Sequence, residues 1–461
     1  MDQVKIVNND TICALATASG GAIGIIRISG DKSLEILSQI FSKDLNNAAP
    51  NTIHYGHIVS SCSDEEGKEV PVDEVLVSVF RAPHSYTGED AAEISCHGSR
   101  YILNKVLELL VAKGCRLARP GEYTQRAFLN GKMDLSQAEA VADLIASTNK
   151  ATHQVALSQL RGNFSSELSH LREKLLKLTS LLELELDFSD HEDLEFADRT
   201  ELENLAEDID RHITTLARSF ETGKAIKQGI PVAIVGSTNV GKSTLLNRLL
   251  HDDKAIVSDI HGTTRDVIED TTEIQGVTFR FIDTAGIRET EDKIEQLGIE
   301  RSFKKLNEAS IVIWLTDERP SNREIEEMLE LTCDKQLIIV QNKIDKSENS
   351  NPEPWMCPML FISAKHGINI DQLEQRIYEA AHLPEIKEND VIITSARHYE
   401  ALIRAHKNLE RVIQSLQLQI SGDLVAEDLR LALAELGEIT GGEISTQETL
   451  NNIFSHFCVG K

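Results

Sequence analysis

The sequence lacks the features that mark secreted, membrane and zinc-stabilised proteins. Its seven cysteines are an odd, scattered set without a CxxC pair, which argues against a disulfide framework and against structural zinc. No apolar run approaches the ~20 residues of a membrane helix, and the start MDQVKIVNND has no cationic region followed by an apolar core. We therefore expect a globular protein in a reducing, cytoplasmic setting.

Positive charge is also scarce. The chain has 74 acidic residues against 47 Lys and Arg, a net charge of -27 that repels naked nucleic acid at long range. If the protein handles RNA, it must do so through a local basic patch or with a basic partner. Much of the acid lies in residues 181–210, where Arg199 is the only Lys or Arg. We interpret this run as a solvated helix face and loop rather than a metal site.

The predicted elements change character along the 461 residues, a length that predicts two to four domains. Strand-like runs such as IGIIRISG (23–30) and EVLVSVF (74–80), with a helical stretch at 101–114, predict a small α+β domain. Leucines spaced three and four apart from Leu168 to Leu186 predict one face of a packed helix. From residue 223, strands and helices alternate as in a parallel sheet.

We therefore predict a multidomain α/β protein in which an α/β unit is inserted into a helical domain. The expected parts are a small α+β N-terminal domain at 1–130, the first part of a helical-bundle domain at 131–222, a P-loop domain with a mostly parallel sheet at 223–381, and the second part of the helical domain at 382–461.

A glycine loop after a predicted strand carries the first chemical signal. Residues 236–243 read GSTNVGKS and match G-x-x-x-x-G-K-[ST] at the start of a predicted helix. Glycines let backbone N–H groups close around phosphates, and a helix N-terminus favours anions. We expect Lys242 to reach the β- and γ-phosphates and the Ser243 hydroxyl to hold Mg²⁺.

Two downstream segments are expected on the γ-phosphate side. The DTAG stretch at 283–286 follows a strand, so that Asp283 can bind a metal-bound water and the Gly286 N–H can meet the γ-phosphate. The loop GTTRD at 262–266 supplies Thr264 as a second hydroxyl for magnesium.

Two others predict recognition of guanine. In NKID (342–345), the carboxylate of Asp345 can accept hydrogen bonds from the guanine N1–H and 2-amino group, a donor pair that adenine lacks. Asn342 can contact N7, and the stem of Lys343 can cover the ring. The segment 363–365, SAK, would place backbone N–H groups at guanine O6. The four ordered elements predict a GTP site.

The usual water-orienting glutamine is missing, because Ile287 follows DTAG. An apolar side chain cannot orient water, so hydrolysis needs another arrangement. Asn239 inside the loop is a candidate oxygen ligand for a monovalent cation beside the phosphates. Glu295 could position the water indirectly, but it is one of several acids in this stretch, and the residues alone favour an exposed helix acid without a catalytic role.

At this point the pattern resembles the tRNA modification GTPases of the MnmE family, also called TrmE. The resemblance covers the whole chain in order, beyond the motifs of the nucleotide site. Its other motifs are DTICALAT (10–17), GIIRISG (24–30), SYTGEDAAEISCHG (85–98), RPGEYTQRAFLNGKMDLSQAEAVADLI (119–145) and the ending FCVGK.

The resemblance assigns roles to residues at matching positions. It implies tetrahydrofolate binding by Arg27, Glu93, Lys132 and Lys461. It implies magnesium ligands at Ser243 and Thr264, and a potassium site at Asn239, Ser258, Ile260 and Thr263. It implies catalytic roles for Glu295, Lys242 and Thr264. The GTP contacts expected from motifs and resemblance together are Asn239, Val240, Gly241, Lys242, Ser243, Thr244, Ser258, Thr263, Thr264, Asp283, Thr284, Ala285, Gly286, Asn342, Lys343, Asp345, Ser363, Ala364 and Lys365.

The implied function is a homodimeric, potassium-activated GTPase. With the FAD-dependent MnmG, in a heterotetramer or larger assembly, it would add an aminomethyl-type group to carbon 5 of the wobble uridine of tRNA. A 5-formyl- or methylene-tetrahydrofolate would supply the one-carbon unit. The matching cysteine is Cys458, either a nucleophile toward the uracil ring or a small apolar residue that packs the tail.

Two other functions stay open at this stage. A regulatory GTPase of ribosome assembly would bind no folate and would be indifferent to Lys461. A folate-dependent methyltransferase carrying the GTPase domain as a passenger would modify its substrate without GTP turnover.

Overall fold

The computed structural model describes most of the chain. The described residues are 10–18, 20–63, 69–187, 199–251, 270–282, 308–346, 358–384, 387, 390–418, 420, 422–442, 450, 453–455, 457 and 460. Contacts divide the chain into two compact units, one of residues 1–145, 159–209 and 407–461 and one of residues 146–158 and 210–406. Within the described ranges, no helix is long and apolar enough to cross a membrane. The domain borders expected at 130, 222 and 381 stay predictions.

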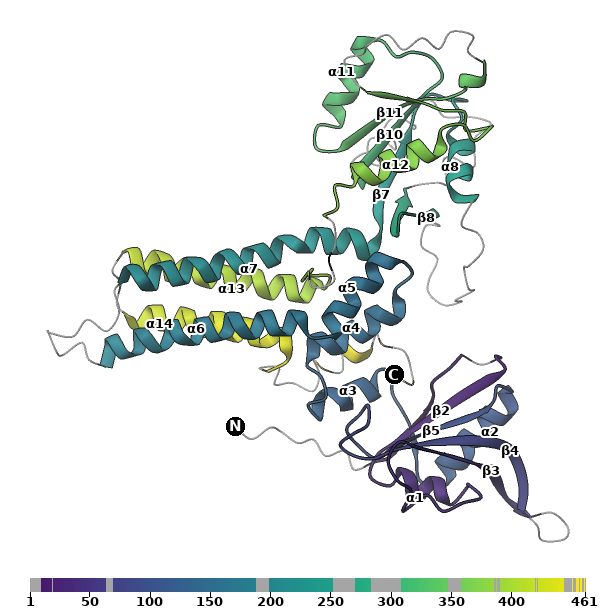
Figure 1. Cartoon of the computed structure of the whole chain (residues 1–461). Helices are drawn as coiled ribbons and strands as arrows, with labels where there is room; N and C mark the ends of the chain where they lie inside the picture. Colours follow the sequence, from purple (N-terminus) through teal and green to yellow (C-terminus); the bar gives the residue numbers. More distant parts are fainter. Residues whose placement is uncertain are drawn as a thin grey trace. The chain divides into compact units, whose positions relative to one another are not determined.

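The first unit begins with a six-stranded sheet (Figure 1). Its order is β3-β4-β5-β2-β1-β6, antiparallel except for the β1–β6 pair. The strands are β1 (Ile12–Leu15), β2 (Ile23–Ser29), β3 (Thr52–Ser63), β4 (Glu69–Phe80), β5 (Ala91–His97) and β6 (Arg116–Leu117). Side chains alternate along each strand, and the buried set packs with leucines of α1 (Ser33–Ser38) and α2 (Arg100–Ala112). The predicted α+β domain is confirmed.

Helices follow the sheet in the chain order that the pattern predicted. They are α3 (Glu122–Leu129), α4 (Leu135–Ala146), α5 (Lys150–Leu160), α6 (Asn163–Asp187), α7 (Arg199–Gln228), α13 (Ala396–Gln417) and α14 (Gly422–Thr440). Asp134 begins α4, since its Oδ1 accepts from the Gln137 amide at 2.9 Å while the Gln137 side chain accepts from the Asp134 amide at 3.0 Å.

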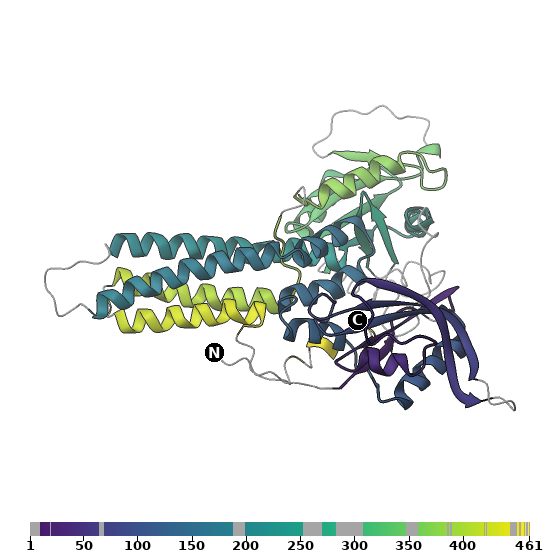
Figure 2. The same ribbon diagram turned by 60° about the horizontal axis from the view of Figure 1, so that its bottom comes forward.

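Long helices pack side by side in the first unit (Figures 1 and 2). The leucine stripe of α6 is buried from Leu168 to Leu182, and α6 lies against α14. Polar contacts tie the same helices together at their edges: Arg430 of α14 pairs with Glu183 of α6 at 3.0 Å, and Lys174 of α6 pairs with Asp208 of α7 at 2.8 Å. The two helical stretches, distant in sequence, therefore share one apolar core.

The second unit contains a six-stranded sheet of order β12-β11-β10-β7-β9-β8, in which only β8 runs antiparallel to its neighbour. Its elements are β7 (Ile230–Val235), α8 (Lys242–His251), β8 (Asp270–Ile274), β9 (Val277–Phe281), β10 (Ile311–Thr316), α11 (Asn322–Leu331), β11 (Gln336–Gln341), a 3₁₀ turn (Ile344–Lys346), β12 (Met359–Phe361) and α12 (Ile370–Ala380). This confirms the predicted mostly parallel sheet. Parallel order brings the carboxyl ends of β7, β10, β11 and β12 to one edge.

The packing of α6 predicts a position-dependent loss of stability. Leu171 is fully buried, so Leu171→Ala should lower the free energy of unfolding by ~2–5 kcal/mol. Urea unfolding followed by circular dichroism measures the change. Leu176, on the same helix and 50% exposed, is the matched control, and Leu176→Ala should stay within ~0.5 kcal/mol of the parent. Equal losses for the two variants would contradict this packing.

Candidate functional site

The loop between β7 and α8 is built around two glycines. Gly236 and Gly241 have φ of +153° and +105°, a region that side chains rarely adopt. A Cβ at Gly236 would collide with the carbonyl oxygen of Leu315 on β10, and a Cβ at Gly241 would collide with the side-chain amide of Asn342. Packing against β10 and β11 therefore requires glycine at both positions, independently of any ligand.

Lys242 is the first residue of α8, and its ammonium turns back over this loop. Its Nζ donates to the carbonyl oxygens of Gly236 and Ser237, both at 2.8 Å. Ser243 and Thr244 follow in the first turn of α8, where the unpaired N–H groups add partial positive charge. An ammonium and a helix N-terminus at one glycine loop form a site for phosphates.

Asn342 joins the phosphate loop to the two segments expected to recognise guanine, 342–345 and 363–365, called here the base-reading segments. It lies just beyond β11 and is buried, with 4% exposure. Its Nδ2 donates to the Val240 carbonyl at 2.9 Å, and its Oδ1 accepts from the Ala364 amide at 2.9 Å. One side chain thus fixes the spacing between three segments that the sequence predicted to share a nucleotide. The amide nitrogen of Asn342 has a second N–H that could donate to guanine N7. That contact stays a prediction.

The Asp345 carboxylate is held in place by the neighbouring loop. Its Oδ1 accepts from the Ser363 hydroxyl at 2.6 Å, and its Oδ2 lies 3.7 Å from Nε2 of His366. Lys343 has a φ of +62°, and its Nζ pairs with Asp317 at the end of β10 at 3.0 Å. The hydrogen bond from Lys343 holds the pKa of Asp317 below its usual value. The base-reading side is therefore preorganised by hydrogen bonds within the protein.

The remaining expected nucleotide residues lie outside the described part of the chain. They are Ser258, Ile260, Thr263, Thr264, Asp283, Thr284, Ala285, Gly286 and Glu295. Their expected roles stay predictions.

A second candidate site lies on the N-terminal sheet. Arg27 of β2 and Glu93 of β5 face each other in register, and their Nε and Oε1 atoms are 2.7 Å apart. Arg27 also donates to the carbonyl of Gly460 at 3.3 Å. The ring of Tyr86 lies 5.9 Å from the Arg27 guanidinium, within the range of a cation–π contact. The structure thus brings two of the predicted folate ligands together beside the chain's last residues.

The other two predicted folate ligands are placed differently. Lys132 is exposed, and its Nζ donates to the carbonyl of Pro83 at 2.8 Å; Pro83 and Tyr86 belong to the same loop between β4 and β5. Lys461 and Cys458 lie outside the described residues. Of the four predicted folate ligands, the structure therefore describes Arg27, Glu93 and Lys132.

Two close contacts near the end of the chain leave room only for glycine, one at Gly460 and one at Gly121. Gly460 is buried with a φ of +89°, and a Cβ there would collide with the carbonyl of Leu15 at the end of β1. Phe454 and Phe457 lie against Gly121, where a Cβ would come within 2.7 Å of the Phe454 carbonyl oxygen. The motifs RPGEY and FCVGK, which sequence reasoning could not connect, are thus two sides of one contact.

Sequence reasoning missed the side chains that support Arg27. The Tyr123 hydroxyl donates to the Arg27 carbonyl at 3.0 Å, and the hydroxyls of Tyr86 and Thr124 are 2.9 Å apart. All three come from the motifs SYTGED and RPGEYTQ. Those motifs were a signal for the region, but spacing along the chain does not show which side chains meet across a sheet.

An ion cluster fixes α3, which carries Tyr123 and Thr124. Glu122 is buried and lies 3.2 Å from the almost fully buried Arg126, and it also pairs with Arg116. Burial would raise the pKa of Glu122, but hydrogen bonds from Arg116 and the Arg119 amide outweigh it and hold this pKa at about 2. Glu122 therefore stays charged at neutral pH, since it is paired with both Arg116 and Arg126.

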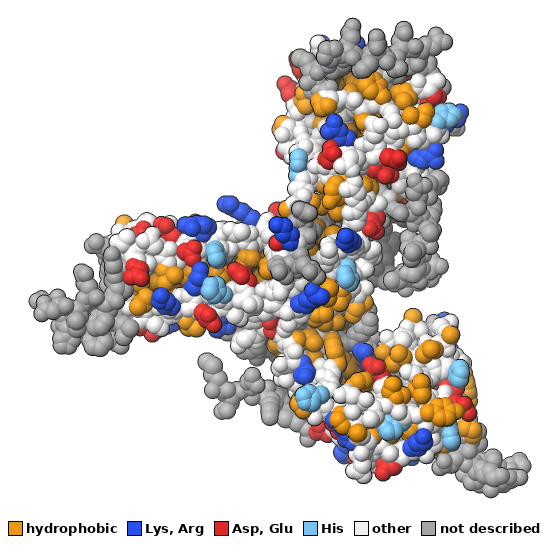
Figure 3. All heavy atoms as spheres, viewed as in Figure 1, with side chains coloured by type: hydrophobic (Ala, Val, Ile, Leu, Met, Phe, Trp, Pro, Cys, Tyr) orange, Lys and Arg blue, Asp and Glu red, His pale blue; other side chains and the backbone are white. Residues whose placement is uncertain are grey.

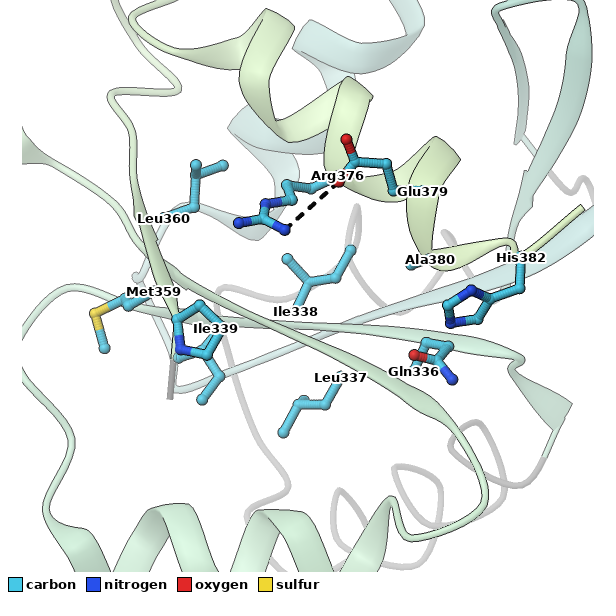
Figure 4. Close-up of a pocket in the computed structure, with 11 residues that line it drawn as sticks. Gln336, Leu337, Ile338, Ile339, Met359, Leu360, Arg376, Glu379, Ala380 and His382 are labelled. Atoms are coloured by element: carbon cyan, nitrogen blue, oxygen red, sulfur yellow. Dashed lines mark hydrogen bonds and ion pairs between the residues drawn. The ribbon is translucent and has the colours of Figure 1, made fainter. Parts of the chain in front are cut away.

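A cavity of about 290 Å³ lies elsewhere in the second unit, between β11, β12 and the end of α12 (Figure 4). Arg376 and Glu379 of α12 stand at its edge over Ile338. It shares no residue with the phosphate loop or the base-reading segments, so the nucleotide site does not include it.

Comparison with known proteins places the chain in a family. The family model for the MnmE helical domain matches residues 135–458, and that for the GTP-binding protein TrmE N-terminus matches residues 11–132. Proteins called tRNA modification GTPase MnmE from Phocaeicola vulgatus, Bacteroides fragilis and Cytophaga hutchinsonii are 55%, 56% and 49% identical to it. These matches cover 99%, 99% and 100% of this chain and 100% of each relative. The chain belongs to the MnmE family of tRNA modification GTPases.

Proposed function

We propose that this protein binds and hydrolyses GTP and uses its turnover to drive modification of the wobble uridine of tRNA. The observation that carries the proposal is the position of Asn342, whose amide holds the phosphate loop and the base-reading loop at a fixed spacing. A glycine loop with an ammonium at its centre binds phosphates, and a positioned carboxylate selects guanine. Two such subsites held by one buried side chain fit a guanosine triphosphate.

The chemistry in the phosphate loop is electrostatic. The Lys242 ammonium would exchange its two carbonyl partners for phosphate oxygens, and the Ser243 hydroxyl, with Thr264, would hold Mg²⁺. Asn239 is the proposed potassium ligand, because its side-chain oxygen can coordinate a cation and the residue is exposed in the phosphate loop. A cation there would neutralise charge that develops on the phosphates. Glu295 is the proposed water-organising residue.

The N-terminal site is proposed to bind 5-formyl- or methylene-tetrahydrofolate as the one-carbon donor. Arg27 and Glu93 are each about 30% exposed, so the pair is open to a ligand while it is held on the sheet. A pteridine offers the amide and amino groups that a carboxylate and a guanidinium can hydrogen-bond. Arg27 donates to the Gly460 carbonyl, and Lys461, the next residue in the sequence, is the proposed fourth folate ligand.

The exposed face of this sheet supports a homodimer. Strand register puts two exposed apolar side chains on the same face as Arg27, since Tyr55 opposes Leu76 and Leu76 opposes Ser95, two positions from Glu93. Tyr55 is 58% and Leu76 46% exposed, and hydrophobic side chains gather on this domain in Figure 3. An uncovered apolar face beside a ligand pair fits contact with a second copy.

The remaining partners follow from the family and from charge. The net charge of -27 makes this chain a poor RNA binder by itself, so tRNA would be held largely by the FAD-dependent MnmG in a heterotetramer or larger assembly. The pair would act in the cytoplasm and add an aminomethyl-type group at carbon 5 of uridine.

Guanine selection is tested at Asp345. Asp345→Asn keeps one acceptor and adds a donor, which clashes with the guanine 2-amino group and matches the 2-oxo group of xanthine. Binding of fluorescent GTP should weaken at least ~10-fold, by the ~1.5–3 kcal/mol of a charged hydrogen bond, while fluorescent XTP should bind more tightly than to the parent. Asp334→Asn, the same change at a 70% exposed position, should alter neither affinity. Undiminished GTP binding by the Asp345 variant would refute this reading.

Folate binding separates the proposed enzyme from a regulatory GTPase. Calorimetric titration with 5-formyltetrahydrofolate should show binding to the parent and at least ~10-fold weaker binding to Arg27→Ala and to Lys461→Ala. Lys43→Ala, at an exposed position of the same domain, should bind like the parent. No heat with the parent protein would remove the folate function and favour the ribosome-assembly alternative. If a variant that does not turn over GTP still modifies tRNA, the methyltransferase alternative is favoured.

The cation role of Asn239 is tested by GTP turnover in KCl and NaCl. Asn239→Gly accepts the left-handed backbone and removes the side-chain amide with its candidate ligand oxygen. The parent should turn over GTP several-fold faster in potassium, and the variant should lose most of that difference with GTP affinity within ~3-fold. Equal rates of the parent in the two salts would end the proposal.

A further inference from the structure

Helix α5 begins against the hairpin of β8 and β9, and one side chain makes the junction. Asn149 precedes the helix, and its Oδ1 accepts from the Thr152 amide at 2.8 Å as an N-cap. Its Nδ2 donates to the hydroxyl of Thr278 on β9 at 2.7 Å. Asn149 is 8% exposed, so water competes little for either bond. The same amide therefore begins a helix and holds a strand of the GTPase sheet.

Backbone and apolar contacts make the junction rigid. The Ala151 amide donates to the carbonyl of Gly276 in the hairpin turn at 3.2 Å. A Cβ at Gly276, where φ is +82°, would lie 3.3 Å from the Cβ of Lys150, tighter than ordinary packing. Ala151 and Val155 are buried in one cluster with Ile274 and Val277 of the hairpin. All these residues belong to the second compact unit.

The hairpin is continuous in sequence with both segments expected to sense the γ-phosphate. Its first strand begins at Asp270, six residues after Thr264, and its second ends at Phe281, two residues before Asp283. β9 also pairs in parallel with β7, which leads directly into the phosphate loop. In nucleotide switches, γ-phosphate contacts order such segments and hydrolysis releases them. The hairpin is therefore connected through the backbone to both of these segments, one at each of its ends.

We propose that Asn149 and Thr278 are positioning residues that pass the nucleotide state of the GTPase sheet into helix α5. The inference rests on the proposed GTP-driven function. Residues 147–149 separate α5 from α4, and α4 begins three residues after Lys132, so the helix is also linked in sequence to the proposed folate site. A joint with one side-chain bridge, one backbone bond and a shared apolar core transmits a displacement as a rigid body.

Hydrogen exchange of the full-length protein tests this directly. The protein is loaded with GDP or with a non-hydrolysable GTP analogue, and exchange is compared for peptides of 150–160 and of 262–290. In the parent, both regions should differ at least ~2-fold in exchange rate between the two nucleotides. Thr278→Val removes the hydroxyl and leaves the Asn149 cap in place. It should remove most of the difference at 150–160 while the difference at 262–290 remains.

Three companion variants exclude a merely structural effect. Thr271→Val makes the same change at an exposed position of β8 and should behave like the parent. Asn149→Ala should repeat the loss seen with Thr278→Val. Asn149→Asp should restore the response, because a carboxylate can accept from both the Thr152 amide and the Thr278 hydroxyl. Basal GTP turnover should stay within ~2-fold in all four variants, whereas modification of tRNA should fall several-fold in Thr278→Val and Asn149→Ala.

The outcomes separate this inference from the function beneath it. If peptides of 262–290 fail to respond to nucleotide in the parent, the GTP-driven function fails and the inference fails with it. If those peptides respond and 150–160 does not, the inference alone is overturned. A full response of 150–160 in Thr278→Val also overturns it.

Discussion

The fit of the chain's last residues against its first strands is the constraint on which the first unit depends. A side chain at Gly460 would collide with the Leu15 carbonyl. A side chain at Gly121 would collide with Phe454 and Phe457. Gly460 lies against the end of β1, so the part of the chain that follows the inserted GTPase part returns to the first unit. Contacts of α6 with α14 join the helices before and after the insertion in an apolar core. The tail is thereby part of the fold, and its carbonyl reaches Arg27.

The second unit uses one buried amide in the same way. The Asn342 side chain occupies space that is open because residue 241 is glycine. Its two hydrogen bonds set the distance between the phosphate and base subsites. A buried polar side chain is costly unless it is hydrogen-bonded, so the two bonds of Asn342 determine its orientation. Glycine and asparagine thus act as a pair, although 101 residues separate them in the sequence.

Local patterns predicted the elements well, and the reason is physical. The strand-like runs at 23–30 and 74–80 and the leucine stripe of α6 are each decided within a few residues; the strands are confirmed, and so is the stripe from Leu168 to Leu182. The nucleotide motifs were also legible, because glycine loops and strand ends have local chemical requirements. The support around Arg27 was not, because Tyr86 and Tyr123 reach it through sheet register and tail docking. The bridge from Asn149 to Thr278 spans 129 residues and has no local signal.

The small energies involved indicate what such bridges can do. One hydrogen bond contributes ~1 kcal/mol, which changes an equilibrium about fivefold and cannot by itself drive a conformational change. A single hydrogen bond can instead direct a movement, because it fixes which part of a helix follows a strand when the strand moves. The energy for movement comes from phosphate contacts, which are charged and several in number. In the proposed mechanism, affinity is concentrated at the nucleotide, Asn342 sets the spacing of its subsites, and the bridge from Asn149 to Thr278 directs the displacement into α5.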